Sequence, residues 1–162
     1  MKILDLIETD FVNYKVPCMT VMFPYCTFKC NKDAGKIVCH NYIFKDSNVV
    51  EMSCDEIVER YIGNPLSEAL VMQGLEPFDS FDELYSLIYK FTEASKDDIV
   101  IYTGYNKEEI EDQIKDLCSI IESNKLIIKF GRFIPDDKPV FDEVLGVELQ
   151  SSNQYAKVIT NG

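Results

Sequence analysis

Three of the chain's six cysteines and its only histidine lie in one short stretch, CTFKCNKDAGKIVCH (residues 26–40). Cys26, Cys30 and Cys39 follow a Cys-x3-Cys-x8-Cys spacing, and His40 comes directly after the third cysteine. Thiolates and imidazoles are metal ligands, and in a reducing compartment clustered cysteines more often bind metals or do redox chemistry than form disulfides. The stretch therefore predicts a metal-binding loop.

The residues of this loop leave three interpretations open. A structural zinc site needs four ligands. The loop could supply them as Cys26, Cys30, Cys39 and His40, but Cys39 and His40 are adjacent and would both have to turn back onto one ion. Three buried thiols without a ligand role fit poorly with the charged and polar residues between them. An iron–sulfur cluster is held by cysteine thiolates, and three of them leave one iron open to a ligand that is not protein.

Composition restricts the partners and the compartment. The chain has 162 residues with 16 basic against 28 acidic side chains and a net charge of −12, so it lacks the basic surplus that binds nucleic acid or an anionic membrane. A secretory signal has a basic start followed by a long apolar run, and the opening MKILDLIETD has neither. We predict one cytoplasmic domain over residues 1–162, with no nucleic-acid and no membrane partner.

Short apolar stretches alternate with stretches of helical spacing along the chain. The predicted strands are VPCMTVMF (16–23), ALVMQG (69–74), DIVIYTG (98–104) and KLIIKF (125–130). The predicted helices follow the capping box SCDE (53–56), begin at Phe81, and follow Asn106 with Glu109. This alternation predicts an α/β fold with a largely parallel sheet and helices outside it. Residues 131–154 predict a long loop, with a final short strand at 155–160.

A polar or glycine-containing segment follows each predicted strand. These segments are the cysteine loop, QGLEP (73–77), TGY (103–105) and GRF (131–133). Ligands of open α/β sheets, and of barrels built from the same units, bind beyond the carboxyl ends of the strands. We therefore expect the four segments to meet at one rim.

In their order along the chain these motifs resemble the radical S-adenosylmethionine superfamily, and within it the small activating proteins of anaerobic ribonucleoside-triphosphate reductase. Cys39-His40-Asn41 is similar to the end of the family's cluster loop, QGLEP to its Gly-Gly-Glu-Pro motif, and IYTGY (101–105) to its third-strand signature. FGRF and VLGVELQSSNQ (144–154) resemble its C-terminal motifs. The resemblance implies a partial (β/α) barrel and a single radical S-adenosylmethionine domain over 1–162, with the cluster loop at 24–41.

The resemblance also implies the cofactors and their ligands. Cys26, Cys30 and Cys39 would bind three irons of a [4Fe-4S] cluster, and S-adenosylmethionine would occupy the fourth. Gly74 and Glu76 would bind its methionine end through backbone carbonyls and a carboxylate. The remaining residues implied to bind the cofactor are Val38, His40, Asn41, Gln73, Leu75, Thr103 and Gly104. No general acid or base is required.

The activity implied is that of an activase, which cleaves S-adenosylmethionine reductively and places a radical on a glycine of a large partner enzyme. That partner would be a glycyl-radical enzyme such as anaerobic ribonucleotide reductase, and a flavodoxin or ferredoxin would donate the electron. A stand-alone radical enzyme acting on a small molecule or peptide is one alternative. A non-catalytic metal-binding module is the other.

The chain departs from the family pattern at three places. The family's loop is usually Cys-x3-Cys-x2-Cys, so the second gap here is longer, and Asp33-Ala34-Gly35 predicts a turn that directs the extra residues outwards. Leu75 replaces the second glycine of Gly-Gly-Glu-Pro, and Phe130 stands where the family usually has an acidic residue before Gly131.

Overall fold

A six-stranded sheet in the order β10-β7-β6-β5-β3-β2 forms the centre of the computed structural model, which describes residues 1–160. β3, β5, β6 and β7 are parallel neighbours, whereas β2 and β10 pair antiparallel at the two edges. The strands of this sheet are β2 (Asp5–Asp10), β3 (Cys18–Phe23), β5 (Ala69–Gly74), β6 (Asp98–Tyr102), β7 (Leu126–Phe130) and β10 (Tyr155–Ile159). The fold is therefore α/β with a largely parallel sheet, and within residues 1–160 the sheet does not close into a barrel.

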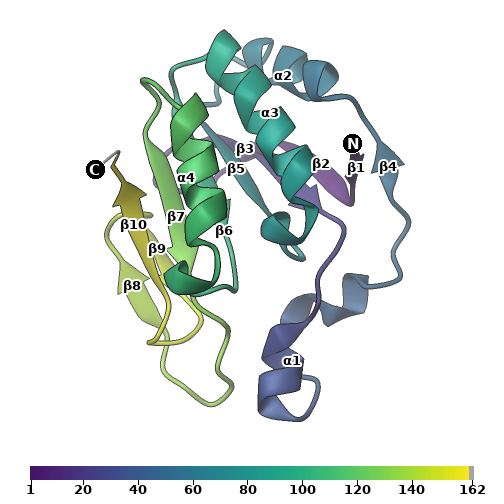
Figure 1. Cartoon of the computed structure of the whole chain (residues 1–162), viewed down its shortest axis with the longest axis vertical. Coiled ribbons are helices and arrows are strands. Elements are labelled where there is room, and N and C mark those ends of the chain that lie inside the picture. Colours follow the sequence, from purple (N-terminus) through teal and green to yellow (C-terminus); the bar gives the residue numbers. More distant parts are fainter. Residues whose placement is uncertain (161–162) are drawn as a thin grey trace.

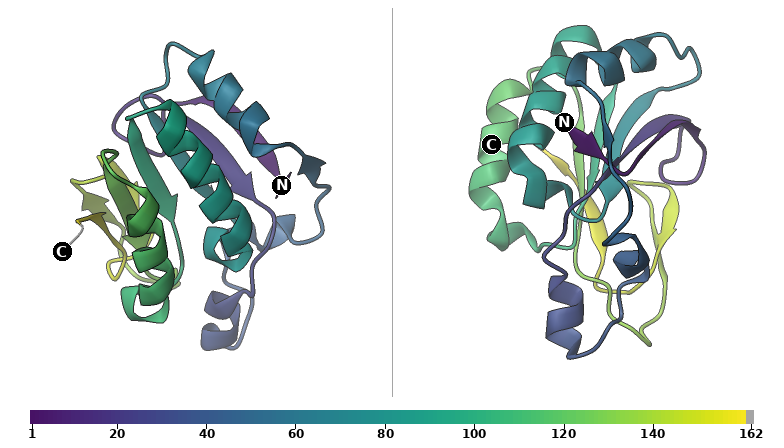
Figure 2. Two further views of the ribbon diagram at one scale, coloured as in Figure 1. Left: turned by 45° about the horizontal axis from the view of Figure 1, so that its top comes forward. Right: turned by 90° about the vertical axis from the view of Figure 1, so that its right-hand side faces the viewer.

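Three helices connect the parallel strands and lie on one side of the sheet (Figure 1; Figure 2, right-hand view). They are α2 (Cys54–Ile62), α3 (Phe81–Ala94) and α4 (Glu111–Ile120). A fourth, short helix, α1, projects beyond the carboxyl ends of the parallel strands (Figure 1). The smaller elements are β1 (Lys2–Ile3), α1 (Lys29–Ala34), η1 (His40–Phe44), β4 (Val50–Glu51), η2 (Pro77–Ser80), η3 (Lys107–Glu109), β8 (Val140–Asp142) and β9 (Val147–Leu149).

Alternate residues of the parallel strands belong to two separate hydrophobic clusters. Val21, Met72, Ile101 and Ile128 face the helices, together with the buried faces of α2, α3 and α4. Residues an odd number of positions away face the opposite side, where the cluster contains Cys18, Val71, Val100 and Ile127. Burial on both faces explains why these strands are continuous apolar runs rather than alternating ones.

The face opposite the helices is covered by irregular chain and a small hairpin. Tyr14, from the β2–β3 connection, and Leu145 and Leu149, from the β8–β9 hairpin, pack there against the sheet. The Tyr14 hydroxyl donates a hydrogen bond to Asp98 Oδ2 at 2.7 Å. The Tyr102 hydroxyl donates to the Asn13 carbonyl at 2.6 Å, so the connection is held at both ends of β6.

The predicted elements compare closely with those observed. The four parallel strands and the final strand are confirmed, and α2 and α3 begin where their signals lie. The capping box of Asn106 and Glu109 is also present, although it caps η3, and α4 begins two residues later. The prediction of an unbroken loop over 131–154 is wrong, because β8 and β9 form an antiparallel hairpin there. The strand β2 was not predicted.

No helix within residues 1–160 is long and apolar enough to cross a membrane.

Candidate metal centre

A cavity of about 430 Å³ opens at the carboxyl ends of the parallel strands. Every cluster or cofactor residue predicted from the sequence lines this cavity except Val38. Those residues are Cys26, Cys30, Cys39, His40, Asn41, Gln73, Gly74, Leu75, Glu76, Thr103 and Gly104. The strand ends therefore bring the four motifs to one rim, although the ligand role of each residue stays a prediction.

Backbone hydrogen bonds position the start of the cysteine loop. Beyond the last strand pair, Leu75 N–H donates to the Phe23 carbonyl at 3.0 Å and Glu76 N–H to the Tyr25 carbonyl at 2.8 Å. Gly74 makes this approach possible with φ of 110°, because a Cβ there would lie 2.7 Å from the Phe23 amide nitrogen. The QGLEP segment thus fixes the chain immediately before Cys26.

The extra residues between the second and third cysteines form α1 and a return limb. The helix carries Cys30 and ends at Gly35, which has φ of 67°, so the predicted turn is confirmed. Asn31 then joins the two limbs, because its Oδ1 accepts hydrogen bonds from Val38 N–H at 2.8 Å and Cys39 N–H at 2.9 Å. This clamp brings Cys39 back beside the helix, despite the long gap.

The three thiols differ in their surroundings. Cys30 Sγ donates a hydrogen bond to Cys39 Sγ, which lowers the pKa of Cys39 to about 7 and raises that of Cys30. Cys26 Sγ accepts a hydrogen bond from Phe28 N–H at 3.1 Å, but burial raises the pKa of Cys26 to about 12. Without a metal, burial therefore keeps Cys26 protonated at neutral pH, and a positive metal centre would have to displace that proton.

The last predicted residues of the loop contact two different parts of the rim. The exposed His40 ring packs against Phe133, with ring centroids 4.8 Å apart. Asn41 Nδ2 donates to the Gly74 carbonyl at 3.0 Å. Asn41 thereby links the end of the cysteine loop to the end of β5.

Glu76 connects the ends of β5 and β6. Its carboxylate accepts hydrogen bonds from Thr103 Oγ1 at 2.8 Å, Gly104 N–H at 2.8 Å and Phe78 N–H at 3.2 Å. The residue is 4% exposed, and burial raises the pKa of its carboxyl group to about 7 despite these bonds. A carboxylate has about four acceptor positions, so one remains for a donor in the cavity.

Lys129 is a lining residue that we did not predict. Its Nζ donates to the Gly131 carbonyl at 3.0 Å and to the Thr103 carbonyl at 3.4 Å, and burial lowers its pKa to about 8. Side chains alternate between the two faces of β7, so Lys129 lies on the same face as Ile127, away from the helices. Its ammonium group lines the cavity from below. A lysine within the otherwise apolar stretch KLIIKF is the signal that could have identified it.

The neighbouring Phe130 has a different role. It is fully buried in the helix-side cluster and its ring contacts Tyr155, with centroids 5.5 Å apart. Phe130, which stands where the family that the sequence resembles usually has an acidic residue, therefore contributes to the core and does not line the cavity.

The C-terminal SSNQ segment supports the rim after β7. Gln154 Nε2 donates to the Gly131 carbonyl at 3.2 Å, and Asn153 Nδ2 donates to the Arg132 carbonyl at 2.8 Å. Ser151, which is fully buried, donates through its hydroxyl to Asn153 Oδ1 at 2.7 Å. These contacts fix the backbone of residues 131–133.

The donor set fits an iron–sulfur cluster. Within residues 1–160 no three His, Cys, Asp or Glu side chains lie close enough together to hold one metal ion. A cluster does not need such a group, because each cysteine binds a different iron. The three thiols of the loop line a single cavity. A backbone N–H donates a hydrogen bond to one of them, and hydrogen bonds to the sulfurs adjust the reduction potential of a cluster.

Fold and site together define an α/β protein with a three-cysteine loop at the carboxyl ends of its parallel strands. The chain belongs to the 4Fe-4S single cluster domain family, whose model matches residues 16–154. This match supports the iron–sulfur interpretation of the loop. No curated protein and no solved structure matches the chain.

Proposed function

We propose that this chain is a radical S-adenosylmethionine activase that generates a glycyl radical on a partner enzyme. The convergence of the cysteine loop, QGLEP and TGY on one cavity carries the proposal. A bound [4Fe-4S] cluster would supply one electron to bound S-adenosylmethionine, whose sulfonium would then break to give methionine and a 5′-deoxyadenosyl radical able to take a hydrogen atom from the substrate. Anaerobic ribonucleotide reductase is the proposed partner, and a flavodoxin or ferredoxin is the proposed electron donor.

The residues of this chain would bind and orient the reactants. Cys26, Cys30 and Cys39 would hold three irons. The remaining acceptor position of Glu76 and the carbonyls near Gly74 suit an ammonium group, which needs three acceptors. The cavity wall at Thr103 and Gly104 is fixed through Glu76, so this side of the pocket is preorganised before ligands enter.

Anaerobic reconstitution with iron and sulfide tests the reaction. We expect about four irons per chain, an EPR signal that changes when S-adenosylmethionine is added, and 5′-deoxyadenosine formation with dithionite. Cys39→Ala should abolish cleavage, whereas Cys54→Ala, on α2, should retain it. Normal cluster assembly and cleavage by Cys39→Ala would contradict the ligand assignment.

The partner requires a separate measurement. Addition of anaerobic ribonucleotide reductase should produce a glycyl radical detectable by EPR, in proportion to the 5′-deoxyadenosine formed. Turnover of a small molecule or peptide without that partner would favour a stand-alone radical enzyme. A bound metal with no cleavage would favour a non-catalytic metal-binding module.

A further inference from the structure

The helix that carries Cys30 has no hydrophobic attachment to the rest of the protein. α1 spans only six residues, and none of them is buried. Isolated helices of this length are unstable in water. Contacts outside the helix must therefore hold it in place.

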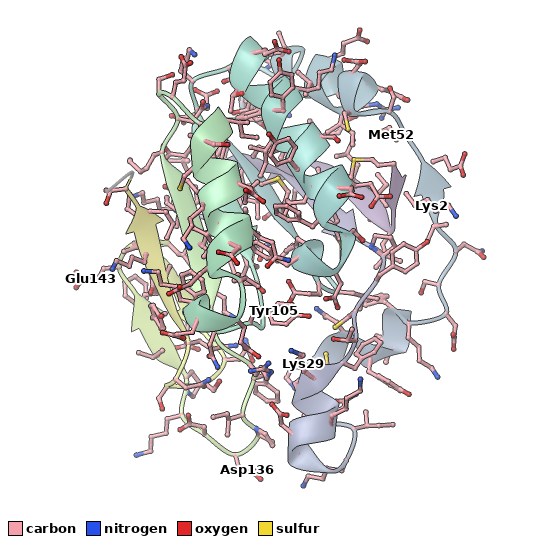
Figure 3. The ribbon with its side chains drawn as sticks, in the orientation of Figure 1. Lys2, Lys29, Met52, Tyr105, Asp136 and Glu143 are labelled. Atoms are coloured by element: carbon pink, nitrogen blue, oxygen red, sulfur yellow. The ribbon has the colours of Figure 1, made fainter. Side chains whose placement is uncertain are left out.

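Charged side chains supply the contacts between α1 and the rim. Arg132 Nη2 donates to Glu109 Oε1 at 2.6 Å, and its Nε forms an ion pair with Asp33 Oδ2 at 3.2 Å. Lys29 Nζ donates to the same Glu109 oxygen at 3.3 Å and lies 4.6 Å from the centre of the Tyr105 ring. Figure 3 shows Lys29 and Tyr105 facing each other across this junction.

Arg132 is the best-shielded member of this group. Its side chain is 16% exposed, against 64% for Asp33 and 43% for Lys29. The hydrogen bond from Arg132 also lowers the pKa of Glu109 to about 2, so the carboxylate stays charged at any working pH. A shielded arginine that contacts two carboxylates contributes more to stability than an isolated ion pair on the surface does.

The position of Arg132 in the fold lets it join three segments. It follows β7, its carbonyl is held by Asn153, and its guanidinium reaches both α1 and the end of η3. The backbone on which it stands is thus fixed, whereas α1 is not packed. A rigid residue that holds a weakly attached helix can determine where that helix lies.

We propose that Arg132 is a positioning residue for the iron–sulfur centre: by holding α1 against Glu109 it fixes the predicted ligand Cys30 beside Cys39. The side chain acts through Asp33 and does not bind iron. Loss of Arg132 therefore loosens the loop and speeds the release of iron, even where the cluster still assembles.

Iron release from the cluster-loaded chain to a ferrous chelator under anaerobic conditions tests this role. We expect Arg132→Met to release iron about fivefold faster than the native chain, as the loss of a partly shielded charge network predicts. Arg132→Lys should lie between them, because an ammonium lacks the planar fork that reaches two carboxylates. Arg60→Met is the matched control. Arg60 lies on α2 and pairs with Glu8 of β2 and Glu56 of α2, away from the cysteine loop, so its loss should leave the rate unchanged.

Salt provides a test that needs no variant. Raising KCl from about 0.05 M to about 0.5 M should accelerate iron release from the native chain, because the carboxylate partners of Arg132 are partly exposed and salt screens their attraction to it. The same change should have a smaller effect on Arg132→Met, in which the pair between Lys29 and Glu109 still joins α1 to the rim. Hydrogen exchange of residues 29–39 should be faster in Arg132→Met than in Arg60→Met, while exchange of β7 stays equal.

Two results would overturn the assignment. One is iron release and exchange in Arg132→Met equal to those of Arg60→Met. The other is an iron-release rate that does not respond to salt in the native chain, or that responds to salt as strongly in Arg132→Met as in the native chain. Should Arg132→Met fail to fold, Asp33→Asn on the exposed side of the junction replaces it, with an expected increase of about twofold. Because chelator extraction requires no S-adenosylmethionine, its outcome is independent of the reaction proposed above.

Discussion

Glu76 and Lys129 place two buried ionisable groups under the ends of three adjacent parallel strands. Burial raises the pKa of Glu76 to about 7 and lowers that of Lys129 to about 8, so the sheet disfavours the charged form of each. Both groups nevertheless hydrogen-bond to the strand ends that form the cavity. Burying these two groups lowers the stability of the fold, while their hydrogen bonds fix the shape of the site. Such a loss of stability is common where polar groups line a binding cavity.

Replacement of Glu76 by glutamine tests this cost through its pH dependence. The folded protein binds the Glu76 proton more tightly than the unfolded chain does, because the pKa rises from 4.5 to about 7. Stability present below the unfolded pKa is therefore lost as pH increases towards 7, by up to about 3 kcal/mol. Anaerobic urea unfolding between about pH 5 and pH 7.5 should show this loss in the native chain and a flatter profile in Glu76→Gln.

The exposed residue Glu122 offers the control for this measurement. Glu122→Gln should keep the pH slope of the native chain. A slope in Glu76→Gln as steep as that of the native chain would show that another group titrates in this range. The comparison uses slopes because the glutamine amide also faces the Gly104 N–H, which destabilises the variant at every pH.

At the scale of elements, the clamp between α1 and the return limb compensates for the long gap between the last two cysteines. Asn31→Ala removes both hydrogen bonds to Val38 and Cys39, whereas Asn31→Asp keeps the oxygen that accepts them and replaces the amide NH2 group by a second oxygen. Two hydrogen bonds contribute about 1–3 kcal/mol, so the alanine variant should lose iron to a chelator about tenfold faster. The aspartate variant should stay within about threefold of the native rate.

Anaerobic iron release measures this difference, with thermal unfolding as a check on the fold. Equal rates for Asn31→Ala and the native chain would mean that the clamp does not control the third cysteine. Equal acceleration in Asn31→Ala and Asn31→Asp would mean that the amide group, and not its acceptor oxygen, is what the loop requires.

The elements that could be predicted from the sequence are those buried on both faces. Strands such as β5 and β7 are unbroken apolar runs, and α3 repeats its apolar residues at helical spacing, so each has a local signal. β2 has acidic residues at Asp5, Glu8 and Asp10 and pairs on one side only, which hides it. β8 and β9 have three residues each, too few to show a period.

The candidate site divides in the same way. Residues at the end of a strand or directly after it, such as Gly74 and Thr103, could be placed at the rim because the sheet order implies it. The clamp at Asn31 and the network at Arg132 could not, since both depend on where α1 folds back in space. Lys129 had a signal in its own strand, because a lysine in an apolar run requires buried partners.

At the scale of the whole molecule, the parallel strands and the cysteine loop are held by different interactions. β3, β5, β6 and β7 lie between two hydrophobic clusters, while the loop is attached by hydrogen bonds, ring contacts and ion pairs. Regions with few buried apolar contacts open at lower free energy than the core. The candidate metal centre is therefore built on a part of the molecule that opens more easily than the sheet.

Hydrogen exchange of the cluster-free and cluster-loaded chain should show this division. Amides of the four parallel strands should exchange slowest in both forms, and those of residues 29–39 among the fastest without a cluster. A ligand that binds only the closed loop protects it by mass action, so cluster loading should slow exchange there by about tenfold or more and leave β7 unchanged. Equal protection of α1 and β7 without a cluster, or no change over 29–39 on loading, would contradict this description. The first outcome would mean that the loop is as rigid as the sheet before iron binds, and that its thiols are positioned by the fold alone. The second would mean that cluster loading does not order the loop.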